Sequence, residues 1–434
     1  MKREAIDELI KWKHSDNRKP LLIRGARQVG KTWLMKSFGN EEYAQCAYVN
    51  FESSQHLKNI FEDDFDIKRI VTALQIETGI AIDPGNTLII LDEIQEASGA
   101  LTSLKYFHEN APEYHIISAG SLLGVALNKP NSFPVGKVEF LNLHPLSFTE
   151  FLEALGEQRL LDLLKSDDWP LIKSFKSKYI QLLKQYYYVG GMPEVVLSFS
   201  TKNDFSELRN IQKGILAAYE QDFSKHAPNE IVPRIRMLWN SVPGQLAKEN
   251  KKFIYGAIKH GARAKDYELA MSWLIDCGLI HKVNRVSKPA IPLKAYEDFS
   301  AFKLFMVDVG LLGAMADIDI KTLLHGNSVF EEFKGALTEQ FVLQQLTIQK
   351  DLSTYYWSAE NGTAEIDFLI QNNGKIVPIE VKAEENLQAK SLISFCQKYN
   401  PATAIRASMS DFRKADWLIN LPLYAISELG RVIC

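Results

Sequence analysis

The feature that most constrains this chain is a glycine-rich turn between an apolar segment and a helical one. Residues 25–32 read Gly-Ala-Arg-Gln-Val-Gly-Lys-Thr and directly follow Leu21-Leu22-Ile23. In the spacing G-x-x-x-x-G-K-[ST], the glycines let successive backbone N–H groups face a phosphate, and the following helix adds its positive end. The lysine reaches the β- and γ-phosphates, and the hydroxyl can ligate Mg²⁺. The turn therefore predicts a nucleotide-binding loop made by Gly25, Ala26, Arg27, Gln28, Val29, Gly30, Lys31, Thr32 and Trp33.

A second segment supplies the acids that such a loop needs. The apolar run Leu88-Ile89-Ile90-Leu91 ends in Asp92-Glu93, so we expect Asp92 to hold Mg²⁺ and Glu93 to act as the base for the attacking water. A glycine-rich turn or an acidic strand end can each be purely structural. Both motifs in this order favour binding of ATP and Mg²⁺, whereas hydrolysis also requires residues that neither motif contains.

Residues 1–150 alternate between short apolar runs and helical stretches. Strands are expected at 20–24, 46–51, 87–92, 114–119 and 137–143. This alternation predicts a parallel sheet with helices on both faces, and ligands bind such sheets at the carboxyl ends of the strands. The fourth strand ends in Ser118-Ala119-Gly120-Ser121. Ser118 or Ser121 is either a sensor of the γ-phosphate or an ordinary polar cap of the next helix.

Composition narrows the class of protein. A length of 434 residues allows several domains, and a net charge of −3 restricts any nucleic-acid contact to local basic patches. The four cysteines are widely spaced and suggest neither disulfides nor a zinc site, so a reducing cytoplasm is expected. No stretch approaches the ~20 apolar residues of a membrane span, and we expect no membrane partner.

The middle of the chain changes character twice. Residues 151–229 are helical and rich in leucine and aromatic side chains, as expected of a lid. In residues 230–315, helices at 233–248 and 263–277 precede strands at 279–285 and 303–307, an order typical of a winged helix. That segment either contacts a DNA backbone or packs between domains with a solvated charged face. Its basic residues are Lys248, Lys251, Lys252, Lys259, Arg263, Lys265, Lys282, Arg285 and Lys288.

Residues 316–434 contain a second group of candidate catalytic residues. Two alternating strands, one with Asp367 and one with Glu380 and Lys382, flank the turn Asn372-Asn373-Gly374, and Glu339 lies on a preceding helix. Glu380 and Lys382 are two apart and so share a strand face. Carboxylates that bind metal at Asp367 and Glu380, with a lysine beside them, suit phosphodiester hydrolysis. A cross-strand salt bridge on a solvated face would give the same pattern.

Several phrases give the chain a family resemblance. The loop at 25–32, Leu91-Asp92-Glu93-Ile94-Gln95, Leu143-His144-Pro145-Leu146-Ser147-Phe148 and Tyr188-Val189-Gly190-Gly191-Met192-Pro193 resemble a large prokaryotic family of AAA-type P-loop ATPases. The tail resembles the domain of unknown function that typically follows this ATPase, and its acids resemble the restriction-endonuclease-like superfamily. The resemblance implies an α/β fold: an ATPase core with a helical lid, a winged helix and an α/β nuclease-like tail. AAA-type ATPases also commonly form rings, so a homo-oligomer is an open expectation.

One departure from that family concerns an arginine. Many relatives have Gly-Arg where this chain has Gly136-Lys137, and lysine cannot copy the bidentate contacts of an arginine that acts on a neighbour's nucleotide. Two functions remain open from the sequence. The first is an ATP-driven enzyme acting on DNA, and the second is a nucleotide-dependent switch with an inactive tail. Acids buried in salt bridges would favour the switch.

Overall fold

The computed structural model describes residues 1–120, 134–248, 251–325, 331–349, 352–360, 363–385 and 389–433. The chain forms two compact units. The ATPase-like unit contains Lys2–His144 and Asp276–Leu279, and the larger unit contains Pro145–Ile275 and Ile280–Cys434. In the described residues, no helix has both the length and the apolar character needed to cross a membrane.

The ATPase-like unit is built on a parallel sheet, as the alternation predicts. Its strands have the order β2-β3-β4-β1-β5, and all of their pairings are parallel. The expected strand positions are confirmed, with bounds that differ by one or two residues. The strands are β1 (Leu21–Arg24), β2 (Gln45–Asn50), β3 (Thr87–Asp92), β4 (His115–Ala119) and β5 (Glu139–Asn142).

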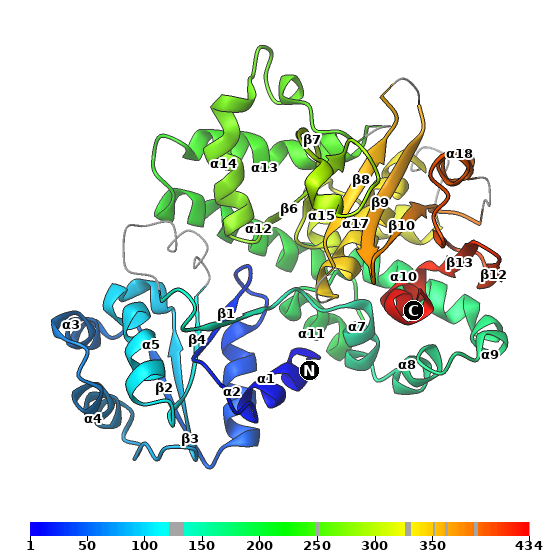
Figure 1. Cartoon of the computed structure of the whole chain (residues 1–434). Helices are drawn as coiled ribbons and strands as arrows, with labels where there is room; N and C mark the ends of the chain where they lie inside the picture. Colours follow the sequence, from blue (N-terminus) through cyan, green and yellow to red (C-terminus); the bar gives the residue numbers. More distant parts are fainter. Residues whose placement is uncertain are drawn as a thin grey trace. The chain divides into compact units, whose positions relative to one another are not determined.

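Helices cover both faces of this sheet, which explains why β3 is apolar along its whole length and fully buried. One core contains Val49, Ile89 and Leu104 and lies under α3, α4 and α5, while α2 contacts β2, β3 and β4 (Figure 1). The helices are α1 (Ala5–Lys13), α2 (Lys31–Glu42), α3 (Gln55–Asp63), α4 (Ile67–Thr78) and α5 (Ser98–Asn110), with the 3-10 turn η1 (Ile94–Glu96) after β3.

The larger unit begins with a run of helices, as expected for residues 151–229. They are α7 (Phe148–Ala154), α8 (Gln158–Leu164), α9 (Trp169–Ser174), α10 (Lys176–Val189), α11 (Pro193–Lys202), α12 (Leu208–His226), α13 (Val232–Leu246) and α14 (Ala264–Asp276), with η2 (Tyr255–Ala257) before α14.

A mixed sheet of order β12-β13-β11-β10-β9-β8-β6-β7 follows (Figure 1). Its strands are β6 (Ile280–Val286), β7 (Glu297–Met306), β8 (Thr354–Ser358), β9 (Glu365–Asn372), β10 (Lys375–Val381), β11 (Ala404–Ser408), β12 (Arg413–Ala415) and β13 (Leu418–Pro422). The helical elements around it are η3 (Leu293–Tyr296), α15 (Val309–Met315), α16 (Ile320–His325), α17 (Glu331–Ile348), α18 (Lys390–Tyr399), η5 (Leu423–Glu428) and α19 (Leu429–Val432).

The two-stranded ribbon expected as a wing is present, but it does not stand apart from the tail. Strands β6 and β7 pair antiparallel, and β6 also pairs parallel with β8 at Arg285 and Tyr356. Val286 and Leu293 pack in one core with Trp357 and Phe395. The expected boundary between 230–315 and 316–434 therefore runs through one continuous sheet, and an independent winged helix is not shown.

Helix α17 holds this unit together through polar side chains that are buried. Gln340 accepts from the N–H of Met306 at 2.8 Å and donates to its carbonyl at 2.7 Å, so it completes the end of β7. Gln344 accepts from Val309 N and donates to Asp308. Gln345 accepts from Phe148 N at the start of α7. Each amide satisfies a backbone group that would otherwise be buried without a partner.

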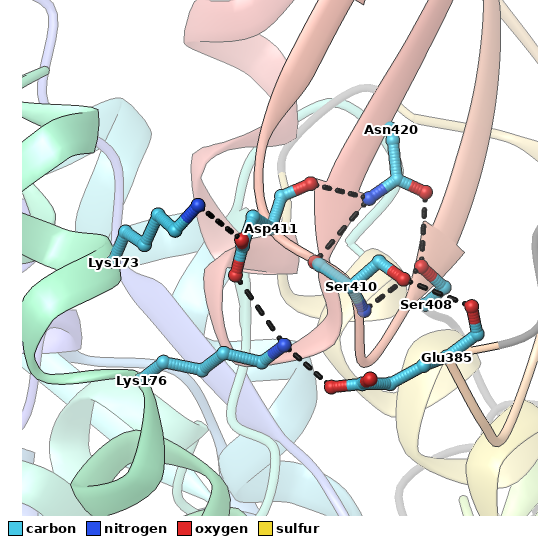
Figure 2. Close-up of polar contacts among 7 residues, drawn as sticks. All are labelled: Lys173, Lys176, Glu385, Ser408, Ser410, Asp411 and Asn420. Atoms are coloured by element: carbon cyan, nitrogen blue, oxygen red, sulfur yellow. Dashed lines mark hydrogen bonds and ion pairs between the residues drawn. The ribbon is translucent and has the colours of Figure 1, made fainter.

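A second polar network attaches the helices α9 and α10 to the loop between β11 and β12 (Figure 2). Lys173 and Lys176 both reach the Asp411 carboxylate, at 2.9 and 3.3 Å, and Lys176 also pairs with Glu385. Asn420 Nδ2 donates to the Asp411 carbonyl at 2.7 Å. These contacts fix the loop and the segment that follows β10 against the helices.

Replacing Gln340 by alanine should destabilise the larger unit. The change leaves the N–H and C=O of Met306 buried without partners, at a cost of about 2 kcal/mol or more. Thermal unfolding followed by circular dichroism should show a lower midpoint than in the wild type. Gln158→Ala, which removes an exposed glutamine from α8, is the matched control and should leave the midpoint unchanged. Equal midpoints for both variants would contradict the role given to Gln340.

Candidate functional site

The glycine-rich turn lies between β1 and α2, at the carboxyl edge of the parallel sheet. Gly30 caps α2 with a φ of 93°, and Gln28 also has a positive φ of 66°. Gly25 has a φ of 152°, and a Cβ atom placed there would lie 2.1 Å from the Leu143 carbonyl oxygen. No other residue type fits position 25, because both the backbone angle and the contact with Leu143 exclude a side chain.

Lys31 is folded back onto its own loop. Its ammonium group donates to the carbonyls of Gly25 and Ala26, each at 2.8 Å, and its side chain is buried. Burial lowers the pKa of Lys31 to about 8, although the charges of Glu93 and Asp92 oppose that change. The ammonium group therefore lies against the backbone of the loop that we expect to bind a phosphate.

Asp92 is the meeting point of three donors at the end of β3. Its Oδ2 accepts from Thr32 Oγ1 at 2.7 Å and from Tyr48 Oη at 3.0 Å, and its Oδ1 accepts from Glu93 N at 3.1 Å. The structure thus brings Thr32 and Asp92 together across sixty positions of sequence, as the motif spacing predicts. Hydroxyl and carboxylate oxygens form the donor set that Mg²⁺ prefers, so these two residues fit that ion.

Glu93 follows in a left-handed conformation, with φ 49° and ψ 46°. The side-chain amide of Gln95 donates to its Oε2 at 2.6 Å, which fixes the carboxylate. Ser118 lies at the end of β4, in register with Leu22 of β1 and Leu91 of β3. Its Oγ is buried and has no hydrogen-bond partner in the described part of the chain. The alternative position, Ser121, lies outside the described residues.

The remaining expected loop residues differ in their surroundings. Trp33 is 47 % exposed on the first turn of α2, while Ala26 and Val29 are buried. Lys137, at the position where relatives carry arginine, forms an ion pair with Glu109 at 2.9 Å. Arg24 stacks on the Phe140 ring at 3.6 Å.

The tail residues converge where the hairpin pattern places them. Phe368 of β9 pairs with Ile379 of β10, so the next pair along the same register is Asp367 with Glu380. Asp367 Oδ2 accepts from Val381 N at 2.7 Å, and Lys382 pairs with Glu380 at 2.7 Å. Burial raises the pKa of Asp367 and of Glu380, and Glu339 lies close enough to both that its charge raises them further. The sheet and α17 thus gather all four expected residues at one place.

Two further lysines, which the sequence analysis did not assign to this site, form ion pairs with its acids. Lys303 of β7 is fully buried and lies 2.5 Å from Glu365 and 3.6 Å from Glu339. Lys251, from the segment between α13 and η2, forms an ion pair with Glu339 Oε1. We call this group the acid–lysine cluster; its members are Glu339, Glu365, Asp367, Glu380, Lys251, Lys303 and Lys382.

The charges in the acid–lysine cluster are strongly interdependent. Burial, together with the charges of Glu339 and Glu380, raises the pKa of Asp367 well above its ordinary value. Glu339 is also buried, but the ammonium groups of Lys251 and Lys303 lower its pKa. Burial opposes the charge on Lys303, yet the surrounding carboxylates raise its pKa. Asp367 is therefore the carboxyl group that most readily holds a proton.

No group of three or more His, Cys, Asp or Glu residues is arranged to hold a metal ion within the described ranges. In the acid–lysine cluster, ammonium groups face the carboxylates that the sequence suggested as metal ligands. The expected metal role of Asp367 and Glu380 therefore remains a prediction. The acids also lie in buried salt bridges, the arrangement that we expected of a switch.

Sequence reasoning missed Tyr48, Lys303 and Arg3. Asn50 of β2 lies opposite Asp92 of β3. Tyr48 is two residues before Asn50, so its side chain lies on the same face of the sheet as the side chains of Asn50 and Asp92. That register was the available signal. Arg3 donates to the carbonyls of Val29 and His144 at 2.9 and 2.6 Å and braces the loop. No local pattern indicates the positions of Lys303 or Arg3, because their partners are distant in sequence.

Three family models match parts of the chain. Residues 17–152 match a family model described as an AAA domain, which supports an AAA-type ATPase. Residues 180–322 and 334–425 match two models of domains of unknown function, DUF8612 and DUF4143. No curated protein matches the chain.

Three solved structures show distant similarity. The Walker-type ATPase PABY2304 of Pyrococcus abyssi is 14% identical, with a TM-score of 0.46, over 73% of this chain and 95% of that one. The ORC1 protein of Aeropyrum pernix, solved in complex with DNA, is 12% identical with a TM-score of 0.27, over 73% and 91%. AMPPCP-bound DnaA from Aquifex aeolicus is 12% identical with a TM-score of 0.26, over 63% and 85%.

Replacing Tyr48 by phenylalanine should weaken the binding of Mg²⁺ at the ATP site. Burial and the nearby Asp92 raise the pKa of Tyr48 to about 12, so its hydroxyl keeps its proton and donates to Asp92. Without that donor, ATP hydrolysis should fall about tenfold, as expected for a hydrogen bond to a charged group. The half-saturating Mg²⁺ concentration should rise while nucleotide binding without Mg²⁺ stays unchanged.

The matched control for this prediction is Tyr43→Phe. The hydroxyl of Tyr43 also forms a hydrogen bond, with 2.7 Å between its Oη and His115 Nδ1, but its partner is not Asp92. An equal loss of turnover in both variants, or an unchanged Mg²⁺ requirement in Tyr48→Phe, would mean that Tyr48 does not position Asp92.

Proposed function

We propose that the chain binds ATP with Mg²⁺ in its ATPase-like unit and hydrolyses it there. The observation that carries the proposal is the 2.7 Å bond between Thr32 and Asp92, beside the buried ammonium group of Lys31. Lys31 would exchange the carbonyls of Gly25 and Ala26 for phosphate oxygens, and Thr32 and Asp92 would hold the ion. Bound Mg²⁺ would neutralise charge on the phosphates. The exposed Trp33 and the buried Ser118 lie around the same loop.

Glu93 is the proposed base for the attacking water. Its carboxylate has a fixed position because Gln95 donates to one oxygen and the strained backbone at Glu93 sets the direction of the side chain. Lys137 is engaged with Glu109, so we do not assign the role of a trans-acting arginine to that position. Turnover should then be slow unless another chain or partner supplies a cation.

For the larger unit we propose a nuclease-like site that is closed in this conformation. The convergence of Glu339, Asp367, Glu380 and Lys382 supports a nuclease-like arrangement, while the salt bridges of Lys251 and Lys303 support an inactive state. Nucleotide-dependent switching is thus the second candidate function. The switch function is favoured if the salt bridges of Lys251 and Lys303 with the acids persist under all conditions, because the acids would then have no catalytic role.

Lys31→Ala should abolish ATP binding or weaken it severely, because the charge that holds the β- and γ-phosphates is removed. Glu93→Gln should retain binding but suppress turnover, since an amide cannot accept the proton of water. Calorimetry measures the first effect and phosphate release the second. Glu96→Gln, an exposed acid three residues away, should behave as the wild type. Equal ATP affinity in Lys31→Ala and the wild type would refute the assignment.

We further propose that DNA contacts the larger unit at exposed basic residues before and within α14. Several of the basic residues expected to bind DNA are used internally. Arg285 pairs with Asp298, and Lys251 pairs with Glu339. The exposed members of the set are Lys252, Lys259, Arg263, Lys265 and Lys288. The proposed contact surface consists of the four that lie before or within α14.

Replacing Lys252, Lys259 and Lys265 together by alanine should flatten the salt dependence of DNA binding. Each lost phosphate contact reduces the slope of log K against log[salt] by about 0.9. Fluorescence anisotropy with duplex and single-stranded DNA gives that slope. A charge-matched control replaces the exposed Lys375, Lys390 and Lys414. If both triple variants show the wild-type slope, or if no DNA binds at low salt, the segment is a packing module.

A further inference from the structure

Beyond Lys2, the chain crosses between its two compact units at three points. It leaves the ATPase-like unit after His144, returns at Asp276 and leaves again after Leu279. The first crossing is tied to the glycine-rich loop by Arg3, whose guanidinium group donates to the carbonyls of Val29 and His144. The other two crossings bound a short segment that joins α14 to β6 and belongs to the ATPase-like unit.

This segment, Asp276–Leu279, lies against the backbone of the glycine-rich loop. A Cβ atom at Gly278 would lie 3.3 Å from Ala26 N and 3.9 Å from the carbonyl carbon of Gly25. The first distance is shorter than the about 3.5–4.0 Å at which heavy atoms pack best. Cys277 and Leu279, on either side of Gly278, are buried. The absence of a side chain at 278 therefore lets the segment approach the Gly25–Ala26 peptide closely.

The Gly25–Ala26 peptide is also the part of the loop that Lys31 holds. The Lys31 ammonium group donates to the carbonyls of Gly25 and Ala26, each at 2.8 Å. When Lys31 turns to phosphate oxygens, as proposed above, both carbonyls lose this charged donor. One peptide thus has Lys31 at its carbonyl and Gly278 at its nitrogen, and ATP binding changes the first of these contacts.

We propose that Gly278 is a positioning residue of the ATP site: it supports the Gly25–Ala26 peptide of the loop, and through this contact ATP binding stabilises β6. Closely packed groups are barely compressible, so a shift of the loop is passed on to the segment that touches it. The linkage is reciprocal, so a change in the larger unit that moves this segment also changes the affinity for ATP. The inference rests on the proposed ATP binding, but not on DNA contact or on the nuclease-like site.

The first test replaces Gly278 by asparagine and measures binding of a non-hydrolysable ATP analogue with Mg²⁺ by calorimetry. Gly278 has a φ of 71°, and asparagine tolerates such a backbone better than most residues with a side chain. The added atoms press on Ala26, so affinity should fall at least about fivefold. Gly79→Asn is the matched control. Gly79 has a φ of 68°, lies in the same unit and would meet no atom within 4 Å, so this variant should bind as the wild type does.

The second test needs no change at Gly278. Hydrogen exchange of the backbone amides of β6 is measured in the wild type with and without saturating analogue. Strand β6 belongs to the larger unit, so slower exchange there reports transmission beyond the ATPase-like unit. We expect exchange to slow at least about fivefold. Lys31→Ala with the same nucleotide should show no change.

The outcomes separate this inference from the proposal on which it rests. If the wild type binds the analogue and Gly278→Asn binds it equally well, or if β6 exchanges at the same rate with and without nucleotide, the inference is overturned and ATP binding stands. If the wild type does not bind the analogue, ATP binding itself is refuted and the inference falls with it. Thermal unfolding without nucleotide shows whether Gly278→Asn folds. If it does not, Gly278→Ala, which adds a single carbon, takes its place.

Discussion

The buried polar face of α17 is the constraint on which the larger unit depends. A helix with Glu339, Gln340, Gln344 and Gln345 inside the protein is stable only if each of these groups has partners. The amides find them at the end of β7, in the Asp308 segment and at the start of α7. The rotation of α17 about its axis is therefore set by hydrogen bonds, and that rotation directs Glu339 toward Asp367.

Both candidate sites contain carboxylates at the ends of strands, but only in the ATP site does the carboxylate charge remain available to a cation. In the ATPase-like unit, Asp92 is surrounded by neutral donors from Thr32, Tyr48 and the backbone, so its charge remains available to a cation. In the acid–lysine cluster, the carboxylates face ammonium groups that already neutralise them. The difference lies in the partners of the acids rather than in the acids themselves. The motif patterns identified Thr32 and Lys382 among these partners, but not Tyr48 or Lys303.

The sequence was informative where the signal is local. The loop at 25–32, the apolar strand before Asp92 and the turn at 372–374 fix the ATP motifs and the pairing of Asp367 with Glu380, because each depends on neighbouring residues. Pairing of β6 with β8 and the positions of Lys251 and Lys303 depend on contacts between distant segments. Lys251 was assigned to a DNA-binding face for the same reason: its charge is evident from the sequence, but its partner is not.

The continuity of the sheet bears on how this protein can be divided by evolution or by proteolysis. The third family match begins at residue 334, after β6, β7, Lys251 and Lys303. A chain that started there would leave β8 without its partner β6 and expose a new sheet edge. It would also keep all four carboxylates of the acid–lysine cluster with Lys382 as their one remaining lysine. The segment matched by that family model is thus smaller than the segment that supplies all three lysines of the acid–lysine cluster.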